Sequence, residues 1–170
     1  MQNNISTINT KDCKLTLSFP EDKTYQNVVY RIVCPDGFTL VGTVGDEGLL
    51  ARMRKRFTSK EYNLFKPHIR SGKPIKVEVL VESLTEETDR YIIEQLLILR
   101  EINKYAKDFF GKDCQITLFN MASYFTDGFK AYLKTRLGNR VLDHKNDLRY
   151  YLAHREDFPQ ITNAVKEAIN

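Results

Sequence analysis

Residues 28–56 constrain the fold of this 170-residue chain more than any other stretch. Two apolar runs rich in β-branched residues, at 28–34 and 38–43, flank Pro35-Asp36-Gly37. Proline fixes φ and glycine permits a positive φ, so these three residues predict a tight turn between two antiparallel strands. The chain is therefore expected to contain a β-hairpin at this point.

A helix is predicted directly after the hairpin, beyond a Gly-rich bend at 45–48. Leu49, Leu50 and Met53 have the spacing of one helix face. Four basic residues crowd the same turns, namely Arg52, Arg54, Lys55 and Arg56. A cationic helix beside the strands is suited to hold a phosphate, although the charge pattern alone equally fits a solvated surface.

Two triplets in this stretch, Val28-Val29-Tyr30 and Leu40-Val41-Gly42, resemble the Gly-Ile-Tyr and Tyr-Ile-Gly motifs of the GIY-YIG nuclease family. The following Leu49-Leu50-Ala51-Arg52 resembles the family's Leu-x-x-Arg. The resemblance covers roughly residues 26–122 and implies that Arg52 is the catalytic arginine. The interval from Gly42 to Arg52 is slightly long, which leaves Arg54 as an alternative.

The chain also departs from the family pattern at two positions. Leu40 replaces the tyrosine of the second triplet, and Thr43 stands where many members carry a lysine. Leu40 lacks the hydroxyl group of the tyrosine, and Thr43 lacks the positive charge of the lysine, so neither can replace the missing group.

The next segment, residues 52–76, concentrates positive charge. The whole chain has a formal net charge of only +4, so the distribution matters more than the total. Clustered cations gain affinity for nucleic acid by releasing counterions from its phosphates, which favours a nucleic acid as the partner. The resemblance to the nuclease family makes DNA the first choice and RNA the second. Glu61 is the one acid among nine basic residues: Arg52, Arg54, Lys55, Arg56, Lys60, Lys66, Arg70, Lys73 and Lys76.

Within this segment, residues 59–69 predict a short second helix with Tyr62, Phe65 and Ile69 on one face. Residues 75–82 alternate apolar and charged side chains, which predicts the third strand of the sheet.

A capping box at residues 83–86 opens a predicted helix that runs to about residue 104. In this helix, the apolar run at 91–99 contains the lone carboxylate Glu94. Burying an unpaired carboxylate is costly, so Glu94 is expected to form a salt bridge, to reach water or to serve a site. The family resemblance implies that it binds a divalent metal.

The predicted fold class is α+β, with a small, mostly antiparallel three-stranded sheet flanked by helices. Three regions are predicted: residues 1–25, a polar loose arm (1–12) followed by a strand at 13–19; residues 26–122, a GIY-YIG-like domain; and residues 123–170, a helical extension. The extension could offer a surface for a protein partner, DNA or a second copy of the chain. Within residues 116–122, Asn120 resembles an asparagine that follows the family's last strand, although a turn or cap role fits it equally.

Three cysteines without a C-x-x-C pair argue against a disulfide framework or a zinc site, so we expect reduced thiols in a cytoplasmic protein. No apolar run approaches the roughly 18 residues that would predict membrane insertion.

The chemistry that the resemblance implies is hydrolysis of a phosphodiester, as in a stand-alone restriction or phage endonuclease. Tyr30 would orient or deprotonate water, Glu94 would hold one Mg²⁺, and Arg52 would neutralise charge on the phosphate. The alternative is an inactive module that binds nucleic acid or a protein partner. The predicted substrate-binding residues are Arg54, Lys55, Arg56, His68, Arg70, Lys73 and Asn120.

Overall fold

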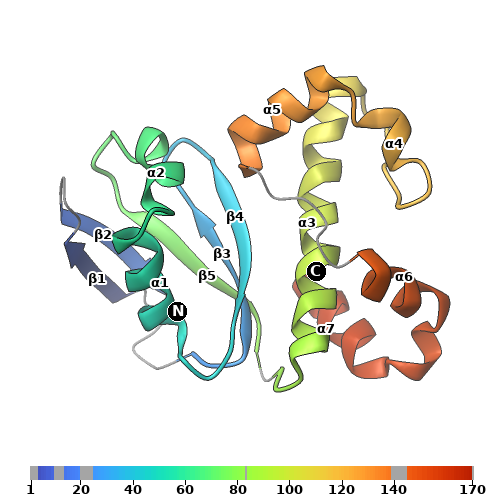
Figure 1. Cartoon of the computed structure of the whole chain (residues 1–170), viewed down its shortest axis with the longest axis horizontal. Helices are drawn as coiled ribbons and strands as arrows, with labels where there is room; N and C mark the ends of the chain where they lie inside the picture. The colour runs from blue at the N-terminus through green and yellow to red at the C-terminus, as the bar shows by residue number, and fades with distance from the viewer. Residues whose placement is uncertain (1–3, 10–13, 20–24, 83, 139–144, 170) are drawn as a thin grey trace. The chain divides into compact units, whose positions relative to one another are not determined.

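The computed structural model describes residues 4–9, 14–19, 25–82, 84–138 and 145–169 (Figure 1). The chain divides into two compact units, Met1–Glu86 and Glu87–Asn170. We call them the sheet unit and the helical unit. The division falls between the last strand and the longest helix, whereas the predicted region boundaries at 25/26 and 122/123 stay predictions.

The sheet unit is built on five strands in the order β1-β2-β5-β3-β4. The predicted α+β class is confirmed, but the prediction of a three-stranded sheet is wrong. The sheet is also mixed, because β2 pairs with β5 in parallel while the other pairs are antiparallel. The strands are β1 (Asn4–Asn9), β2 (Lys14–Phe19), β3 (Val28–Val33), β4 (Thr39–Val44) and β5 (Ile75–Val81).

The two strands beyond the predicted three, β1 and β2, come from the N-terminal region. The predicted strand at 13–19 is confirmed as β2, with Cys13 outside the described residues. The predicted loose arm at 1–12 is wrong, because Asn4–Asn9 forms β1. Every residue of β1 pairs with β2, and Ile8 is buried in the core. Pairing with an existing strand therefore outweighs the low β-propensity of asparagine.

The predicted hairpin is confirmed as the antiparallel pair β3 and β4, in which Tyr30 lies opposite Gly42. Gly37 adopts a φ of 94°, and its N–H donates to the carbonyl of Cys34 over 2.9 Å. The Asp36 carboxylate accepts a hydrogen bond from the Phe38 N–H over 3.0 Å. The turn residues therefore act as their types predict.

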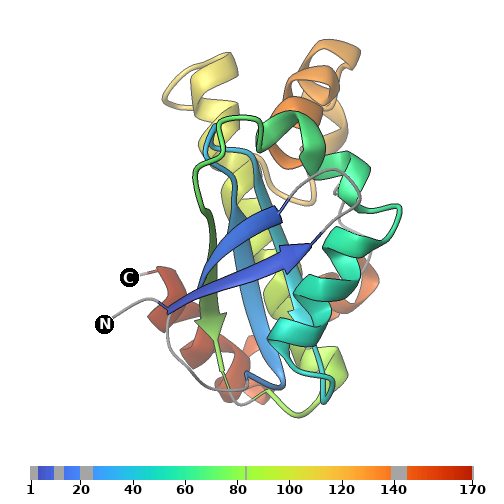
Figure 2. The ribbon, with the colours of Figure 1, turned by 90° about the vertical axis from the view of Figure 1, so that its left-hand side faces the viewer.

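Three short helices cover one face of this sheet, as Figures 1 and 2 show: α1 (Leu49–Thr58), α2 (Tyr62–Phe65) and the 3₁₀ helix η1 (Lys66–His68). The predicted helices after the bend and around residues 59–69 are thereby confirmed. Leu49 and Met53 are buried as predicted, but Leu50 is 37% exposed. The apolar face of α1 continues instead through Phe57, whose ring packs against Phe65 at 5.0 Å.

The helical unit contains α3 (Glu87–Phe110), α4 (Met121–Tyr124), α5 (Asp127–Leu137), α6 (Lys145–Ala153), η2 (Arg155–Asp157) and α7 (Pro159–Ile169). The predicted helices of the C-terminal region are confirmed, and α3 continues six residues beyond the predicted end. Helices α5, α6 and α7 all contact α3. Residues 116–120 form no strand; they turn into α4.

None of the helices in the described part of the chain combines the length and the apolar character that crossing a membrane would require.

Candidate active site

The ring of Tyr30 lies in the core between the sheet and α1, and the side chain is 0% exposed. Its neighbour on β4 is Gly42, the glycine of the second predicted triplet. A Cβ atom at position 42 would lie 2.7 Å from the Tyr30 hydroxyl oxygen, closer than side chains tolerate. The glycine therefore makes room for the end of the phenol, which gives this pair of motif residues a steric reason.

Arg56, on α1, is hydrogen-bonded to the Tyr30 hydroxyl. Its Nε–H donates to Tyr30 Oη over 2.7 Å, and its Nη1 donates to Glu61 Oε2 over 2.8 Å. Arg56 is 5% exposed, so the predicted role as a direct substrate ligand does not match its environment. A buried guanidinium needs acceptors, and Tyr30 and Glu61 supply them.

Arg52 lies one turn earlier on α1, and its side chain remains 26% exposed. Burial alone would lower its pKa, but charge interaction and hydrogen bonding with Tyr30, together with Glu47 and Glu61, raise it above the usual value. Among the described residues, its Nε is buried without a hydrogen-bond partner. Arg52 is therefore the member of the Tyr30–Arg52–Arg56 cluster through which an anion could reach the phenol.

The position of Arg52 follows from the start of α1. Gly48, with a φ of 86°, precedes the helix, and the N–H of Leu49 donates to the carbonyl of Tyr25 over 2.8 Å. This anchor fixes the first turn of α1 against the sheet. Arg54 and Lys55 lie on the same helix but are exposed, so the structure brings Arg52, and not the alternative Arg54, to Tyr30.

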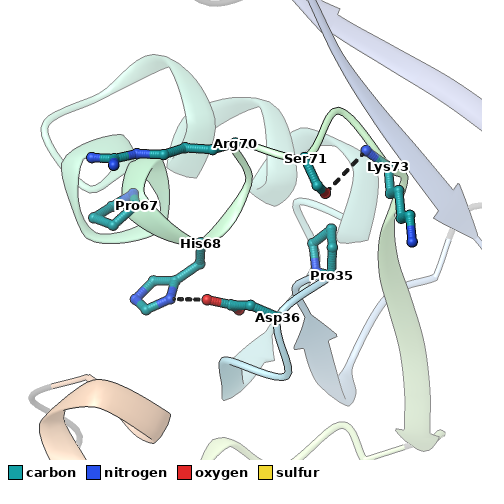
Figure 3. A pocket seen from close by; sticks show the side chains of 7 residues that line it. All are labelled: Pro35, Asp36, Pro67, His68, Arg70, Ser71 and Lys73. Atoms are coloured by element: carbon teal, nitrogen blue, oxygen red, sulfur yellow. Dashed lines mark hydrogen bonds and ion pairs between the residues drawn. The ribbon is translucent and has the colours of Figure 1, made fainter.

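Three further predicted substrate-binding residues, His68, Arg70 and Lys73, line one surface pocket of about 230 Å³ in the sheet unit (Figure 3). His68 Nδ1 lies 2.6 Å from Asp36 Oδ2. The imidazole also stacks on Phe38, with ring centroids 4.0 Å apart. The turn alone explains Asp36 in the sequence, and no local pattern there predicts its role as the partner of His68.

Glu94 lies on α3 in the helical unit and is 5% exposed, so of the three predicted alternatives the position that reaches water does not match the structure. It is not free of interactions in the structure. The pKa of Tyr91, one turn earlier, is raised first by its hydrogen bond to Glu87, then by burial and by the negative charges of Glu87 and Glu94. The Glu94 carboxylate therefore lies within an apolar run of α3, close enough to the Tyr91 phenol for its charge to raise the pKa of that phenol.

The donor chemistry of Glu94 fits the predicted Mg²⁺, which prefers hard oxygen ligands. The described residues include no cluster of three or more His, Cys, Asp or Glu side chains that could hold a metal. Mg²⁺ commonly binds through one or two carboxylates and takes its other ligands from water and phosphate. Glu94 would be the protein ligand in such a site.

Asn120 has a local structural role. Its side-chain oxygen accepts from the Thr117 N–H over 2.7 Å, and its amide donates to the Gln115 carbonyl over 3.0 Å. These bonds fix the turn that leads into α4. Of the two roles that the sequence left open, the structure assigns Asn120 that of a turn residue.

Cys34 is a free thiol in the core of the sheet unit. Burial, together with the charge of Asp36, raises its pKa to about 12. The thiol stays protonated at neutral pH, so Cys34 is no nucleophile in this structure.

The structure adds Glu61 to the candidate site. As the partner of buried Arg56, it completes the chain of contacts from Tyr30 to the surface. One feature of the sequence pointed to it: Glu61 is the single acid in the basic segment at 52–76.

Comparisons with models of known protein families, with curated proteins and with solved structures found no match. The likeness to the GIY-YIG family therefore stays a prediction carried by the motif residues themselves.

Proposed function

We propose that this protein is a metal-dependent endonuclease of the GIY-YIG type that hydrolyses phosphodiester bonds in DNA. The observation that carries the proposal is the contact among Tyr30, Gly42 and Arg52. These residues belong to three separate sequence motifs, and both Gly42 and Arg52 lie against the Tyr30 phenol. The antiparallel arrangement of β4, β3 and β5, with α1 between β4 and β5 in the chain, supports it further.

Each residue has a role that its chemistry permits. The Tyr30 hydroxyl would orient or deprotonate the attacking water, while Arg56 holds the hydroxyl oxygen in place through a hydrogen bond. Arg52 would neutralise the charge that develops on the phosphate, because a guanidinium stays charged and offers forked donors. Mg²⁺ held by Glu94 would supply electrostatic stabilisation of the phosphate oxygens.

The charged surface of the sheet unit supports DNA as the substrate. Arg54, Lys55 and Lys60 are exposed and form no ion pairs within the described residues. Cations without acidic partners are available to phosphates, and their binding releases counterions from the nucleic acid.

A second candidate function is nucleic-acid binding without cleavage. The full burial of Tyr30 favours it, because the hydroxyl is withdrawn from solvent and already accepts a hydrogen bond from Arg56. In this alternative, the cluster has a structural role, and the exposed cations bind the backbone.

Cleavage of supercoiled plasmid in the presence of Mg²⁺ or Mn²⁺ tests the proposal. We expect nicked and linear products from the wild-type protein and none from Glu94→Gln. The matched control is Glu101→Gln, which alters another buried glutamate of α3 and should keep its activity. Tyr30→Phe should slow cleavage by about 10²- to 10⁴-fold, the usual contribution of a positioned proton-transfer group.

The same preparation distinguishes the two candidates. No cleavage, together with DNA retention that weakens steeply as salt rises, would support the binding module instead. Equal cleavage by wild-type and Glu94→Gln protein would remove Glu94 from the site.

A further inference from the structure

The pocket in Figure 3 is a separate feature from the Tyr30 cluster, because Tyr30, Arg52 and Arg56 are not among its lining residues. It is formed by the hairpin turn, η1 and the loop before β5, and its lining residues are Pro35, Asp36, Pro67, His68, Arg70, Ser71 and Lys73. Three of these are basic and one is acidic. Charged side chains therefore make up about half of the lining, which is unusual for a gap left by imperfect packing of apolar side chains.

The imidazole of His68 is fixed in this pocket by contacts on two sides. Asp36 Oδ2 binds Nδ1 at 2.6 Å, and Phe38 stacks on the ring face with an interplanar angle of 13°. Asp36 is itself held by the Phe38 N–H. Because Nδ1–H donates to the Asp36 carboxylate, Nε2 can donate to an anion only when the imidazole is protonated.

The remaining polar groups suit an anion. Arg70 and Lys73 are exposed and form no ion pair with any described residue. Ser71 Oγ accepts from the Lys73 N–H over 3.4 Å, which leaves the hydroxyl proton of Ser71 available. The charged ends of Arg70 and Lys73 extend to either side of the pocket (Figure 3), so both side chains would have to change rotamer to contact one phosphate together.

The Asp36 carboxylate does not favour a cation here. It already accepts bonds from Phe38 and His68, and the two basic side chains beside it repel a metal ion. The volume of about 230 Å³ also lies below the roughly 300 to 1,000 Å³ of pockets that enclose a drug-sized ligand. A small anionic group fits these limits better than a whole nucleoside.

We infer that this pocket binds a phosphate group through Arg70, Lys73 and the Ser71 hydroxyl, with Nε2–H of the protonated His68 imidazole as a further donor. The phosphate can be free, at the end of a nucleic acid or within its backbone. The inference goes beyond the proposed cleavage, because the pocket binds phosphate whether or not the chain hydrolyses DNA.

Titration of the full-length protein with inorganic phosphate tests the inference, with backbone-amide and imidazole NMR shifts as the readout. Chloride at matched ionic strength serves as the reference. We expect saturable shifts at Ser71, Gly72, Lys73 and His68 that chloride does not produce.

A double variant, Arg70→Ala with Lys73→Ala, should weaken phosphate binding by roughly tenfold, since each exposed cation contributes modestly. Lys130→Ala with Lys134→Ala is the matched control: it removes the same charge from exposed positions on α5 and should change the affinity less than twofold. His68→Gln is a second variant, which removes the imidazole but keeps the charges of Arg70 and Lys73, and it should weaken phosphate binding less than the double variant does.

Three results would overturn the inference: shifts that do not saturate, shifts that chloride reproduces, or an equal loss of affinity in the α5 control. Oligonucleotides with a 5′-phosphate or a 5′-hydroxyl then identify the source. A terminal-phosphate site binds the phosphorylated form more tightly, and the Arg70/Lys73 double variant removes that preference. A backbone site binds both forms alike, and the double variant weakens both. Cleavage plays no part in this readout, so a failed nuclease assay leaves the result interpretable.

Discussion

Two paired groups in the sheet unit connect the hairpin to the helices that follow it, and they differ in burial. Tyr30, Arg56 and Glu61 form a chain of hydrogen bonds that starts in the core. Asp36 and His68 form a pair at the rim of a surface pocket, and the Asp36 side chain is 48% exposed. Changes in the first group are expected to lower the stability of the fold, whereas changes in the second should have little effect on it. Groups that start in the core, such as Tyr30–Arg56–Glu61, hold the fold around the candidate site, whereas surface groups such as Asp36–His68 remain accessible to a ligand.

The largest effect is expected from Arg56→Ala. Loss of the guanidinium removes the hydrogen bond that Arg56 donates to the Tyr30 hydroxyl and opens a cavity beside Gly42. Because Glu61 is half exposed and can be hydrated, we expect a loss of roughly 2 to 3 kcal/mol, below the full effect of breaking a buried pair. Urea denaturation measures it, and Arg54→Ala on the exposed face of α1 should change stability by less than about 0.5 kcal/mol. Similar losses in both variants would show that Arg56 is not a structural support.

Gly42→Ala should have the next largest effect. The added Cβ would lie 2.7 Å from the Tyr30 hydroxyl oxygen and 3.2 Å from Arg56 Nη2, so the phenol or the strand must shift. Overpacking of this kind costs about 1 to 3 kcal/mol. Gly128→Ala in α5 is the control, because its nearest neighbour, Phe109, lies at an ordinary 3.8 Å and alanine favours a helix. A Gly42→Ala protein as stable as the wild type would contradict the close contact.

The smallest effect is expected from Asp36→Asn, and it should depend on pH. Burial alone would raise the pKa of Asp36, but hydrogen bonds from Phe38 and His68 lower it below its ordinary value. The ionised carboxylate therefore stabilises the fold above the unfolded-state pKa of about 4 and loses this contribution as pH falls through the folded-state pKa. We expect Asp36→Asn to melt slightly below the wild type near neutral pH and at the same temperature in strong acid. A constant difference across pH would rule out the carboxylate's charge as the cause.

Much of the sheet unit could be predicted because its local chemistry is explicit. Pro35-Asp36-Gly37 specifies a turn, and the alternation in residues 75–82 specifies a half-buried strand. β1 could not be predicted, since its residues pair with β2 only once that strand exists as a template. The parallel contact of β2 with β5 joins segments more than fifty residues apart, which local patterns do not encode.

The sequence predicts which residues belong to the candidate site better than it predicts the role of each one. Tyr30 and Arg52 were selected by motif spacing, and the structure brings them together. Arg56 was grouped with exposed cations, because a charge pattern does not show which face of a helix is buried against a phenol. Asp36 was missed as a partner of His68, since its turn role already explained its presence.

The central claim is that the Tyr30 hydroxyl and the Arg52 guanidinium, which lie together in the sheet unit, act on a phosphate of DNA. The rate at which Arg52→Ala cleaves supercoiled plasmid in Mg²⁺ tests it most directly, with Arg54→Ala on the exposed face of the same helix as the matched control. We predict that Arg52→Ala cleaves about 10²- to 10³-fold more slowly than the wild type, because it removes the charge that neutralises the phosphate, and that Arg54→Ala loses far less. Equal rates in the two variants would contradict the claim.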